Sequence, residues 1–365
     1  MNRERYIRQT SLKDFGVAGQ QALSKSSVLV VGVGGLGIPV LQYLNAMGVG
    51  TLGMVEQDLI ELSNLQRQVL FSEEDLGKQK LQVARDKLRA TNSGTILKTH
   101  DSFLTRDNAL EIIASYDVVV DATDNFATRY LVNDACVILK KPFVYGALHG
   151  FEGHISVFNY RGGPTYRCLF PEPPNNETIP DCNENGVLGV IPGIVGSLQA
   201  LEVVKILANV GEVMYGKLLL YNGLNQSFHK INFPVIPRNL ERSSLEKSYE
   251  IPLCTSLKQV SVASFKKVME GTDSWQLIDV RNPEEFNQDP DPIPQAINIP
   301  LSELVTQTDQ IKLNHTLYFV CQTGIRSLTA ISLLGSKFPE NEMYSIIGGM
   351  DLWRTTLQKA SKSLD

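Results

Sequence analysis

The sequence has little of what would place a protein in a specialised class. It has five cysteines in 365 residues, an odd number without a C-x-x-C pair, which argues against a disulfide framework and against a four-thiolate zinc site. A net charge of −5 offers no electrostatic case for nucleic acid or an anionic membrane as partner. No uninterrupted apolar run reaches the roughly 18 residues of a membrane helix, and the N-terminus lacks a signal-peptide core. We therefore expect a cytoplasmic protein without nucleic-acid or membrane partners.

The chain is long enough for two domains. From residue 28 to about 150, short apolar runs alternate with amphipathic segments, which is typical of a Rossmann-like, doubly wound, mostly parallel α/β sheet. The apolar segment 194–208 predicts a helix packed between layers or subunits. A proline-rich, charged stretch at 235–254 predicts a linker, and a second α/β pattern follows it. The expected domains are therefore 1–234 and 255–365.

A glycine-rich turn follows the first predicted strand. Gly32, Gly34 and Gly37 have the spacing G-x-G-x-x-G, which lets a strand turn tightly into a helix and lets the backbone approach a phosphate. The start of that helix offers unpaired N–H groups and the positive end of its dipole to the anion. Glu56 ends the next apolar run, about 20 residues beyond the last glycine, where a ribose-binding acid belongs. These features fit NAD and ATP equally.

Charged side chains further along favour ATP. Asp58, the segment Ser63-Asn-Leu-Gln-Arg-Gln68 and Lys80 supply a set for which a dehydrogenase has no use, because its pyrophosphate is already bound at the helix end. An enzyme that splits ATP needs these cations, because negative charge builds up on the α-phosphate and the departing pyrophosphate. Asp124, in Asp121-Ala-Thr-Asp-Asn125, follows a predicted strand at the sheet edge where ligands bind and is placed to hold Mg²⁺.

A simpler interpretation of the same residues stays open. Arg67 and Lys80 could be solvated surface charges, and Asp124 or Asn125 could cap the helix that follows them. Capping and metal binding are compatible at the last two positions.

Taken together, these segments resemble the HesA/MoeB/ThiF family of ubiquitin-like-protein activating enzymes. Arg5-Tyr-Ile-Arg-Gln9, GVGGLG, SNLQRQ, GKQK and TDN occur in that family's order and spacing, over roughly residues 3 to 232. The resemblance implies a homodimer that binds ATP and Mg²⁺. It further implies adenylation of the C-terminal Gly-Gly carboxylate of a ubiquitin-fold sulfur-carrier protein of the MoaD/ThiS kind, in a molybdopterin-type or thiamine-type sulfur pathway.

The resemblance also implies roles for single residues. Arg8 would reach into the partner subunit's site as an arginine finger, Gly35 and Glu56 would contact the phosphate and the ribose, and Asp124 would line the ATP site. The remaining residues implied to line the ATP site are Ser63, Asn64, Leu65, Gln66, Arg67, Lys80 and Asn125.

The second predicted domain contains a single cysteine, Cys321. Cys321 begins the segment Cys321-Gln-Thr-Gly-Ile-Arg-Ser327, which follows a buried-type strand and precedes a helical run. A thiol at a helix N-terminus beside Arg326 favours the thiolate and would stabilise a persulfide. The alternative, a small buried hydrophobe at a strand end, is disfavoured by the polar neighbours Gln322, Thr323 and Arg326.

This loop resembles that of a single rhodanese domain, which would cover roughly residues 255 to 360. The other segments that carry the resemblance are Leu277-Ile-Asp-Val-Arg281, Ala296-Ile-Asn-Ile-Pro300 and Gly348-Gly-Met-Asp-Leu-Trp353. The resemblance implies that Cys321 receives sulfane sulfur from a donor protein or from thiosulfate and carries it as a persulfide. The fusion of the two domains is similar to that of MoeZ-type sulfurylases.

The two resemblances combine into one reaction sequence. ATP converts the carrier's carboxylate into an acyl-adenylate, the Cys321 persulfide attacks it, and a second thiol frees the thiocarboxylate by thiol–disulfide exchange. Cys182, in the polar segment 172–186, matches the family's active-site cysteine and could supply that thiol or form a thioester. A loop cysteine without function is the alternative. Cys136 and Cys254 are interpreted as core and linker residues.

The sequence departs from the family at its zinc site. Many relatives carry two C-x-x-C pairs, whereas Thr165-Tyr-Arg-Cys168 keeps one thiol and the segment after Phe233 has none, so a structural zinc ion is not expected. Two competing functions remain. One is an NAD-linked oxidoreductase, based on the glycine turn and Glu56 alone, and the other is a rhodanese part that serves for docking without turnover.

Overall fold

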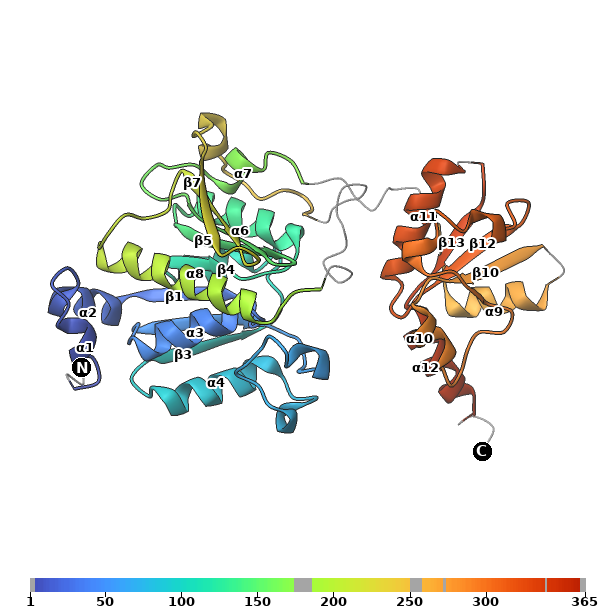
Figure 1. The fold of residues 1–365 in the computed structure, drawn as a ribbon, viewed down its shortest axis with the longest axis horizontal. Helices are drawn as coiled ribbons and strands as arrows, with labels where there is room; N and C mark the ends of the chain where they lie inside the picture. Colours follow the sequence, from blue (N-terminus) through green and yellow to red (C-terminus); the bar gives the residue numbers. More distant parts are fainter. Residues whose placement is uncertain (1–3, 174–185, 250–257, 272–273, 339, 362–365) are drawn as a thin grey trace. The chain divides into compact units, whose positions relative to one another are not determined.

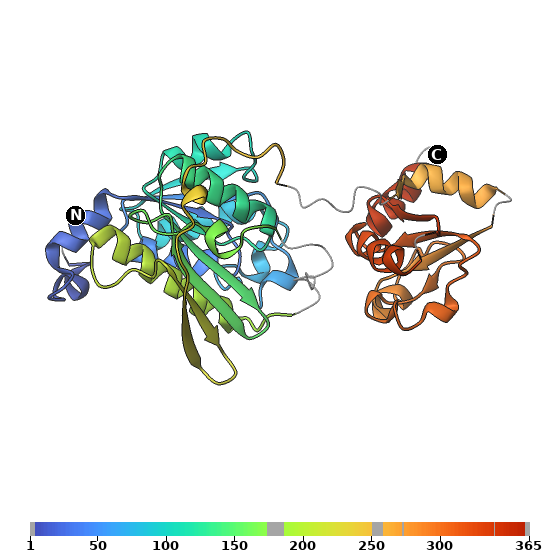
Figure 2. The same cartoon turned by 90° about the horizontal axis from the view of Figure 1, so that it is seen from above.

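The computed structural model describes residues 4–173, 186–249, 258–271, 274–338 and 340–361 (Figure 1). Contacts divide the described residues into two compact units, the first up to residue 249 and the second from residue 258 on. Figures 1 and 2 show the helices and strands of each unit in two perpendicular views. Cys182 and Cys254 lie outside the described residues.

Within the described residues, the first unit contains an eight-stranded sheet in the order β3-β2-β1-β4-β5-β6-β7-β8. Strands β1 to β5 run parallel, whereas β6, β7 and β8 are antiparallel to their neighbours. This arrangement confirms the doubly wound, mostly parallel sheet. The strands are β1 (Ser27–Val31), β2 (Thr51–Glu56), β3 (Ile96–Asp101), β4 (Val118–Asp121), β5 (Phe143–His149), β6 (Glu152–Phe158), β7 (Lys217–Asn222) and β8 (Ser227–Asn232).

Helices cover both faces of this sheet (Figure 1). Successive side chains of a strand point to opposite faces, so Val28 and Val30 of β1 belong to one core cluster and Leu29 and Val31 to the other. The first cluster is covered by α2 (Gly16–Lys25), α3 (Gly37–Ala46), α4 (Lys80–Thr91) and α8 (Val190–Ala208), and the second by α5 (Ala109–Ala114), α6 (Phe126–Ile138) and α7 (Tyr166–Leu169). The remaining elements are α1 (Ile7–Thr10) and the short 3-10 turns η1 (Leu62–Asn64), η2 (Glu73–Asp75) and η3 (Pro237–Leu240).

Helix α8 is long and apolar enough to cross a membrane by length and composition alone. In the structure it packs against α3, β5 and β6, and its polar residues are hydrogen-bonded inside the fold. The Gln199 amide donates to the Asp121 carbonyl at 2.8 Å, and the Glu202 carboxylate accepts from the Met214 N–H at 2.8 Å. A core helix of a globular domain has these contacts, as predicted for segment 194–208.

Residues 235–249, for which the sequence predicts a linker, pack against the first unit. The fully buried carboxylate of Asp134 on α6 binds the Arg167 Nε at 2.8 Å, the Arg242 Nη1 at 3.1 Å and the Tyr249 hydroxyl at 2.8 Å. A buried carboxylate needs such partners. This segment is charged like a solvated linker, but in the structure its side chains form polar contacts that hold it against the first unit.

The second unit contains, within its described residues, a five-stranded parallel sheet in the order β11-β10-β12-β13-β9. Two core clusters again lie on its two faces, one beneath α11 and one beneath α9 and α12. Its elements are β9 (Lys258–Val260), α9 (Val262–Glu270), β10 (Trp275–Asp279), α10 (Pro283–Asn287), β11 (Ile297–Asn298), η4 (Leu301–Glu303), η5 (Thr308–Gln310), β12 (Thr316–Val320), α11 (Ile325–Lys337), β13 (Met343–Ile346) and α12 (Gly349–Ser361).

Candidate functional site

A cavity of about 670 Å³ opens in the first unit at the carboxyl ends of β1, β2 and β4. The chain leaves β1 toward β2 on one side, and β4 lies on the other, so this is the topological switch point at which open α/β sheets bind ligands. The volume suits a small molecule. The structure brings most of the predicted residues together here: Gly32, Gly34, Gly35, Glu56, Asp58, Ser63, Asn64, Gln66, Arg67, Lys80, Asp124 and Asn125.

The glycine turn after β1 forms one wall of the cavity. Gly32 has a φ of +97°, and a Cβ at position 37 would lie 1.9 Å from the Gly32 carbonyl oxygen, so the turn requires glycine at both positions. Gly37 does not line the cavity. The missing Cβ lets α3 begin against the turn, and a ligand contact by Gly37 stays a prediction.

Glu56, at the end of β2, is held by backbone N–H groups. One carboxylate oxygen accepts from Val33 in the glycine turn at 3.1 Å, and the other accepts from Gln57 and Asp58 at 2.9 and 3.0 Å. Three of roughly four lone-pair positions are therefore occupied, which leaves capacity for one further donor from the cavity. A ribose contact by Glu56 stays a prediction.

Two cationic side chains face the same cavity. Lys80 begins α4 and is only 5% exposed, with its Nζ 3.1 Å from the Asp58 carboxylate. Arg67 donates from Nη1 to the Ser63 carbonyl at 3.0 Å. The burial of Lys80 contradicts the solvated-charge interpretation, because an ammonium group is rarely buried without an anionic partner. Leu65, predicted to line the site, instead packs against the hydrophobic core, because an apolar side chain gains by turning inward.

Asp124 and Asn125, which follow β4, have different contacts. Asn125 caps α6 by accepting the Thr128 N–H at 2.9 Å, which bears out the capping alternative for this residue, while Asp124 is exposed and lines the cavity. In the described part of the chain, no three His, Cys, Asp or Glu side chains form a metal cluster by themselves. One carboxylate nevertheless fits Mg²⁺, which takes one or two carboxylates together with phosphate oxygens and water.

Arg129, for which the sequence predicts no role, also lines the cavity. It is 7% exposed, donates to the Thr123 carbonyl at 3.0 Å and lies 5.5 Å from the centre of the Tyr145 ring. Burial raises the pKa of the nearby Asp121, although the charge of Arg129 acts in the opposite direction. Its position one helical turn after the Asn125 cap is the signal that could have identified it. Thr123, Thr128, Gln68 and His149 are further lining residues without a predicted role.

Arg8 lies apart from this set. It is an exposed residue of α1 and does not line the cavity of its own chain. Any contact of Arg8 with such a cavity would have to be made in a second subunit. Cys182 lies outside the described residues, and its role stays a prediction.

The sulfur of Cys321 occupies a cradle of N–H groups in the second unit. Cys321 follows β12 and is fully buried, and its Sγ accepts from the N–H of Gly324 at 3.1 Å and of Ser327 at 3.4 Å. Such donors can stabilise negative charge that the sulfur carries during a reaction. Arg326 is not a free cation, because its two terminal nitrogens bind the Glu285 carboxylate at 2.7 Å each. This pairing holds the pKa of Glu285 below its ordinary value.

Two other cysteines are described in the first unit. Cys136 is a core residue, as predicted. Cys168 joins α7 to the segment after β8, since its sulfur accepts the N–H groups of Ile236 at 3.3 Å and of Thr165 at 3.4 Å. These are the two segments that lack the zinc-binding pairs. The prediction that no structural zinc is bound remains to be tested.

Comparison with known proteins gives the same division of the chain. Residues 6–239 match the ThiF family, and residues 261–356 match the rhodanese-like domain. Two proteins named adenylyltransferase and sulfurtransferase MOCS3, from Culex quinquefasciatus and Anopheles gambiae, are each 38% identical over 97% of this chain and cover 88% and 87% of their own lengths. The crystal structure of E. coli MccB with ATP has a TM-score of 0.57 at 23% identity, over 64% of this chain and 72% of that one. These matches do not support an NAD-linked oxidoreductase.

Proposed function

The chain belongs to the ThiF family and carries a C-terminal rhodanese-like domain, and from that premise we propose that it is an ATP-dependent adenylyltransferase and sulfurtransferase. Its substrate would be the C-terminal Gly-Gly carboxylate of a small ubiquitin-fold sulfur carrier, and its product the corresponding thiocarboxylate. The observation that carries the proposal is the presence, in one chain, of a cation-lined cavity behind a glycine turn and of a cysteine sulfur in an N–H cradle.

The first step belongs to the cavity. A carboxylate oxygen of the carrier attacks the α-phosphate of ATP, the bond to the β-phosphate breaks, and pyrophosphate leaves. Lys80 and Arg67 supply positive charge where negative charge develops. Mg²⁺, held by Asp124 and phosphate oxygens, would supply further charge neutralisation. Because these groups are fixed by burial and by backbone contacts, little reorganisation is needed during the reaction.

The second step belongs to Cys321. Its terminal persulfide sulfur attacks the acyl carbonyl carbon, a C–S bond forms, the C–O bond to AMP breaks, and AMP leaves with the electron pair. The acyl disulfide that remains is then cleaved when a second thiolate forms a disulfide with Cys321 and releases the thiocarboxylate. We assign that thiol to Cys182. A disulfide reductant must afterwards restore both cysteines.

The proposal includes a homodimer in which Arg8 acts on the partner's cavity. Support comes from large apolar side chains that are exposed and lie near Arg8 in the sequence, namely Ile7, Leu12 and Val17, since exposed apolar side chains that gather on a surface mark protein interfaces. Mixing Arg8→Ala protein with Lys80→Met protein tests this arrangement. A mixed dimer has one intact cavity served by one intact Arg8, so activity should reappear on mixing, whereas no recovery would contradict action in trans.

The function itself is tested with purified protein, ATP, Mg²⁺, a sulfur donor and carriers of both the molybdopterin and the thiamine type. We expect carrier-dependent pyrophosphate release, and a carrier whose mass increases by the difference between sulfur and oxygen. A carrier truncated by its last two glycines is the matched control and should give neither signal. Failure of every Gly-Gly carrier to elicit pyrophosphate release would refute the proposal.

A further inference from the structure

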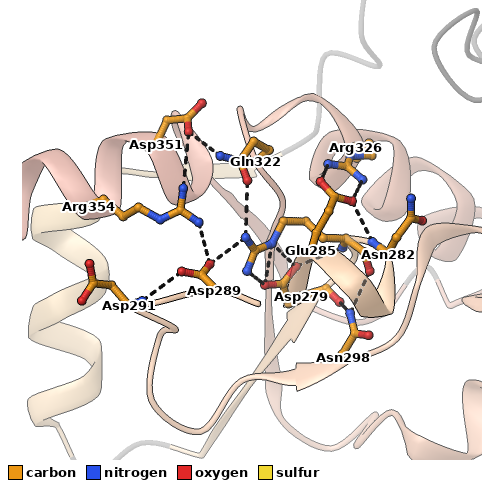
Figure 3. A network of polar contacts seen from close by, with 11 residues as sticks. Asp279, Asn282, Glu285, Asp289, Asp291, Asn298, Gln322, Arg326, Asp351 and Arg354 are labelled. Carbon is orange, nitrogen blue, oxygen red and sulfur yellow. Dashed lines mark hydrogen bonds and ion pairs between the residues drawn. The ribbon is translucent and has the colours of Figure 1, made fainter. Parts of the chain in front are cut away.

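Five side chains form a closed polar ring beside the Cys321 loop (Figure 3). The Arg281 Nη1 donates to the Gln322 Oε1 at 3.3 Å, and the Gln322 Nε2 donates to the Asp351 carboxylate. Arg354 forms ion pairs with Asp351 at 3.9 Å and with Asp289 at 2.7 Å. Asp289 closes the ring through an ion pair with the Arg281 Nη1 at 2.7 Å. We call this set of residues the Gln322 ring.

The ring is anchored on its buried side. The side chains of Arg281 and Asp289 are 1% and 0% exposed, and Arg281 also binds Asp279, the last residue of β10, at 2.7 Å. Burial opposes the ionisation of Asp289, but hydrogen bonds from Arg354 and Arg281 outweigh it and hold its pKa below the ordinary value. These charges are therefore fixed, and Gln322 is the ring member that belongs to the reactive loop.

The chemistry of the ring demands an amide at position 322. The side chain must accept from a guanidinium and donate to a carboxylate at the same time. Glutamate cannot donate, and lysine or arginine cannot accept. Gln322 directly follows the reactive cysteine, so its side chain fixes the loop at the point nearest the sulfur.

The backbone of α12 also forms hydrogen bonds with Cys321 and Gln322. The N–H of Met350 donates to the Cys321 carbonyl at 2.9 Å, and the N–H of Asp351 donates to the Gln322 carbonyl at 3.1 Å. Gly349 permits this approach, since a Cβ there would lie 2.1 Å from the Cys321 carbonyl oxygen. The first two carbonyls of the loop are thus bound to α12, while later N–H groups of the loop are directed at the sulfur.

We propose that Gln322 is a positioning residue. Through the Gln322 ring it holds the 321–327 loop so that the N–H groups of Gly324 and Ser327 stay directed at the Cys321 sulfur. The inference rests on the sulfur-transfer role of Cys321 proposed above. It adds residues to that site which neither touch the sulfur nor belong to its loop, namely Asp289, Asp351 and Arg354.

The test measures the pH dependence of Cys321 alkylation by iodoacetamide, followed on the Cys321 peptide by mass spectrometry. Methionine is close to glutamine in shape but lacks the amide donor and acceptor. In Gln322→Met we expect the pH at which alkylation reaches half its maximal rate to rise by about 1 unit, and sulfur transfer to fall about tenfold. The reason is that loss of the N–H contacts disfavours the thiolate. Gln310→Met replaces an exposed glutamine outside both the ring and the 321–327 loop and should match the wild type.

A second pair of variants separates positioning from folding. Asp351→Asn keeps an acceptor for Gln322 and should stay near the wild type in both readouts, whereas Asp351→Ala should behave like Gln322→Met. Wild-type alkylation profiles in Gln322→Met and Asp351→Ala, or an Asp351→Asn variant as impaired as Asp351→Ala, would overturn the proposal. So would a large drop in the melting temperature of Gln322→Met. Alkylation requires no carrier protein, so a failure of the proposed overall function would be recognised separately.

Discussion

Replacement of Lys80 by methionine tests whether the buried positive charge of this residue contributes to adenylation. The Nζ of Lys80 faces the cavity, and its partner Asp58 has a side chain that is 54% exposed. A unit charge about 4 Å from a developing negative charge is worth about 4 kcal/mol at an effective dielectric constant near 20, and removal of one fixed donor in other enzymes costs about 10²- to 10³-fold in kcat. We therefore expect carrier-dependent pyrophosphate release to fall by about 10²- to 10³-fold.

The same substitution should leave the fold intact. Methionine fills a similar volume, and loss of a half-exposed ion pair costs about 0 to 1 kcal/mol of unfolding free energy. Lys78→Met is the matched control, because Lys78 lies two residues away, is 57% exposed and pairs with Asp75 outside the cavity. Activity of Lys80→Met within threefold of the wild type, or an equal loss in Lys78→Met, would refute the assignment.

Three further predictions concern the turn, the acid range and the sulfur. Gly37→Ala should destabilise the first unit by about 3 kcal/mol or more in a denaturant titration, because its Cβ would lie 1.9 Å from a carbonyl oxygen, whereas Gly34→Ala, with no atom nearer than 3.8 Å, should stay within about 1 kcal/mol. The pKa values of Glu285 and Asp289 are lowered by their arginine partners. The stabilisation that these carboxylates give is therefore present above the unfolded pKa near 4 and is lost as the pH falls further. Denaturation followed by the fluorescence of the two tryptophans, both in the second unit, should show an unfolding free energy that is constant from about pH 7 to 5 and falls below about pH 4. Cys321→Ala should abolish thiocarboxylate formation and leave carrier-dependent pyrophosphate release within twofold, and retained sulfur transfer would instead favour a docking role for the second unit.

The buried strands and the cavity residues are the parts that the sequence predicts well. Runs 28–31 and 51–55 correspond to β1 (Ser27–Val31) and β2 (Thr51–Glu56), because strands covered on both faces are continuously apolar. The hairpin of β7 and β8 was not predicted. The side chains of β8 are mostly exposed, so the strand carries polar residues that resemble a loop in the sequence.

Contacts between distant residues could not be predicted. Glu56 reaches the N–H of Val33, and Arg354 meets Asp289 at a separation of 65 residues, and no local pattern contains such pairs. The misassigned linker has the same cause, since a charged segment appears solvated until its buried partner is known. Motif spacing located the cavity, whereas only the folded chain shows which side chains support it.

The carboxylate of Asp134 determines where the chain can be divided. Truncation after residue 234 would remove Arg242 and Tyr249 and leave only Arg167 to neutralise a charge that has no access to water. Removing one partner of a buried ion pair costs about 3 to 5 kcal/mol, a large fraction of the stability of a typical domain. An autonomous N-terminal fragment should therefore extend through Tyr249, ten residues beyond the end of the family match at 239.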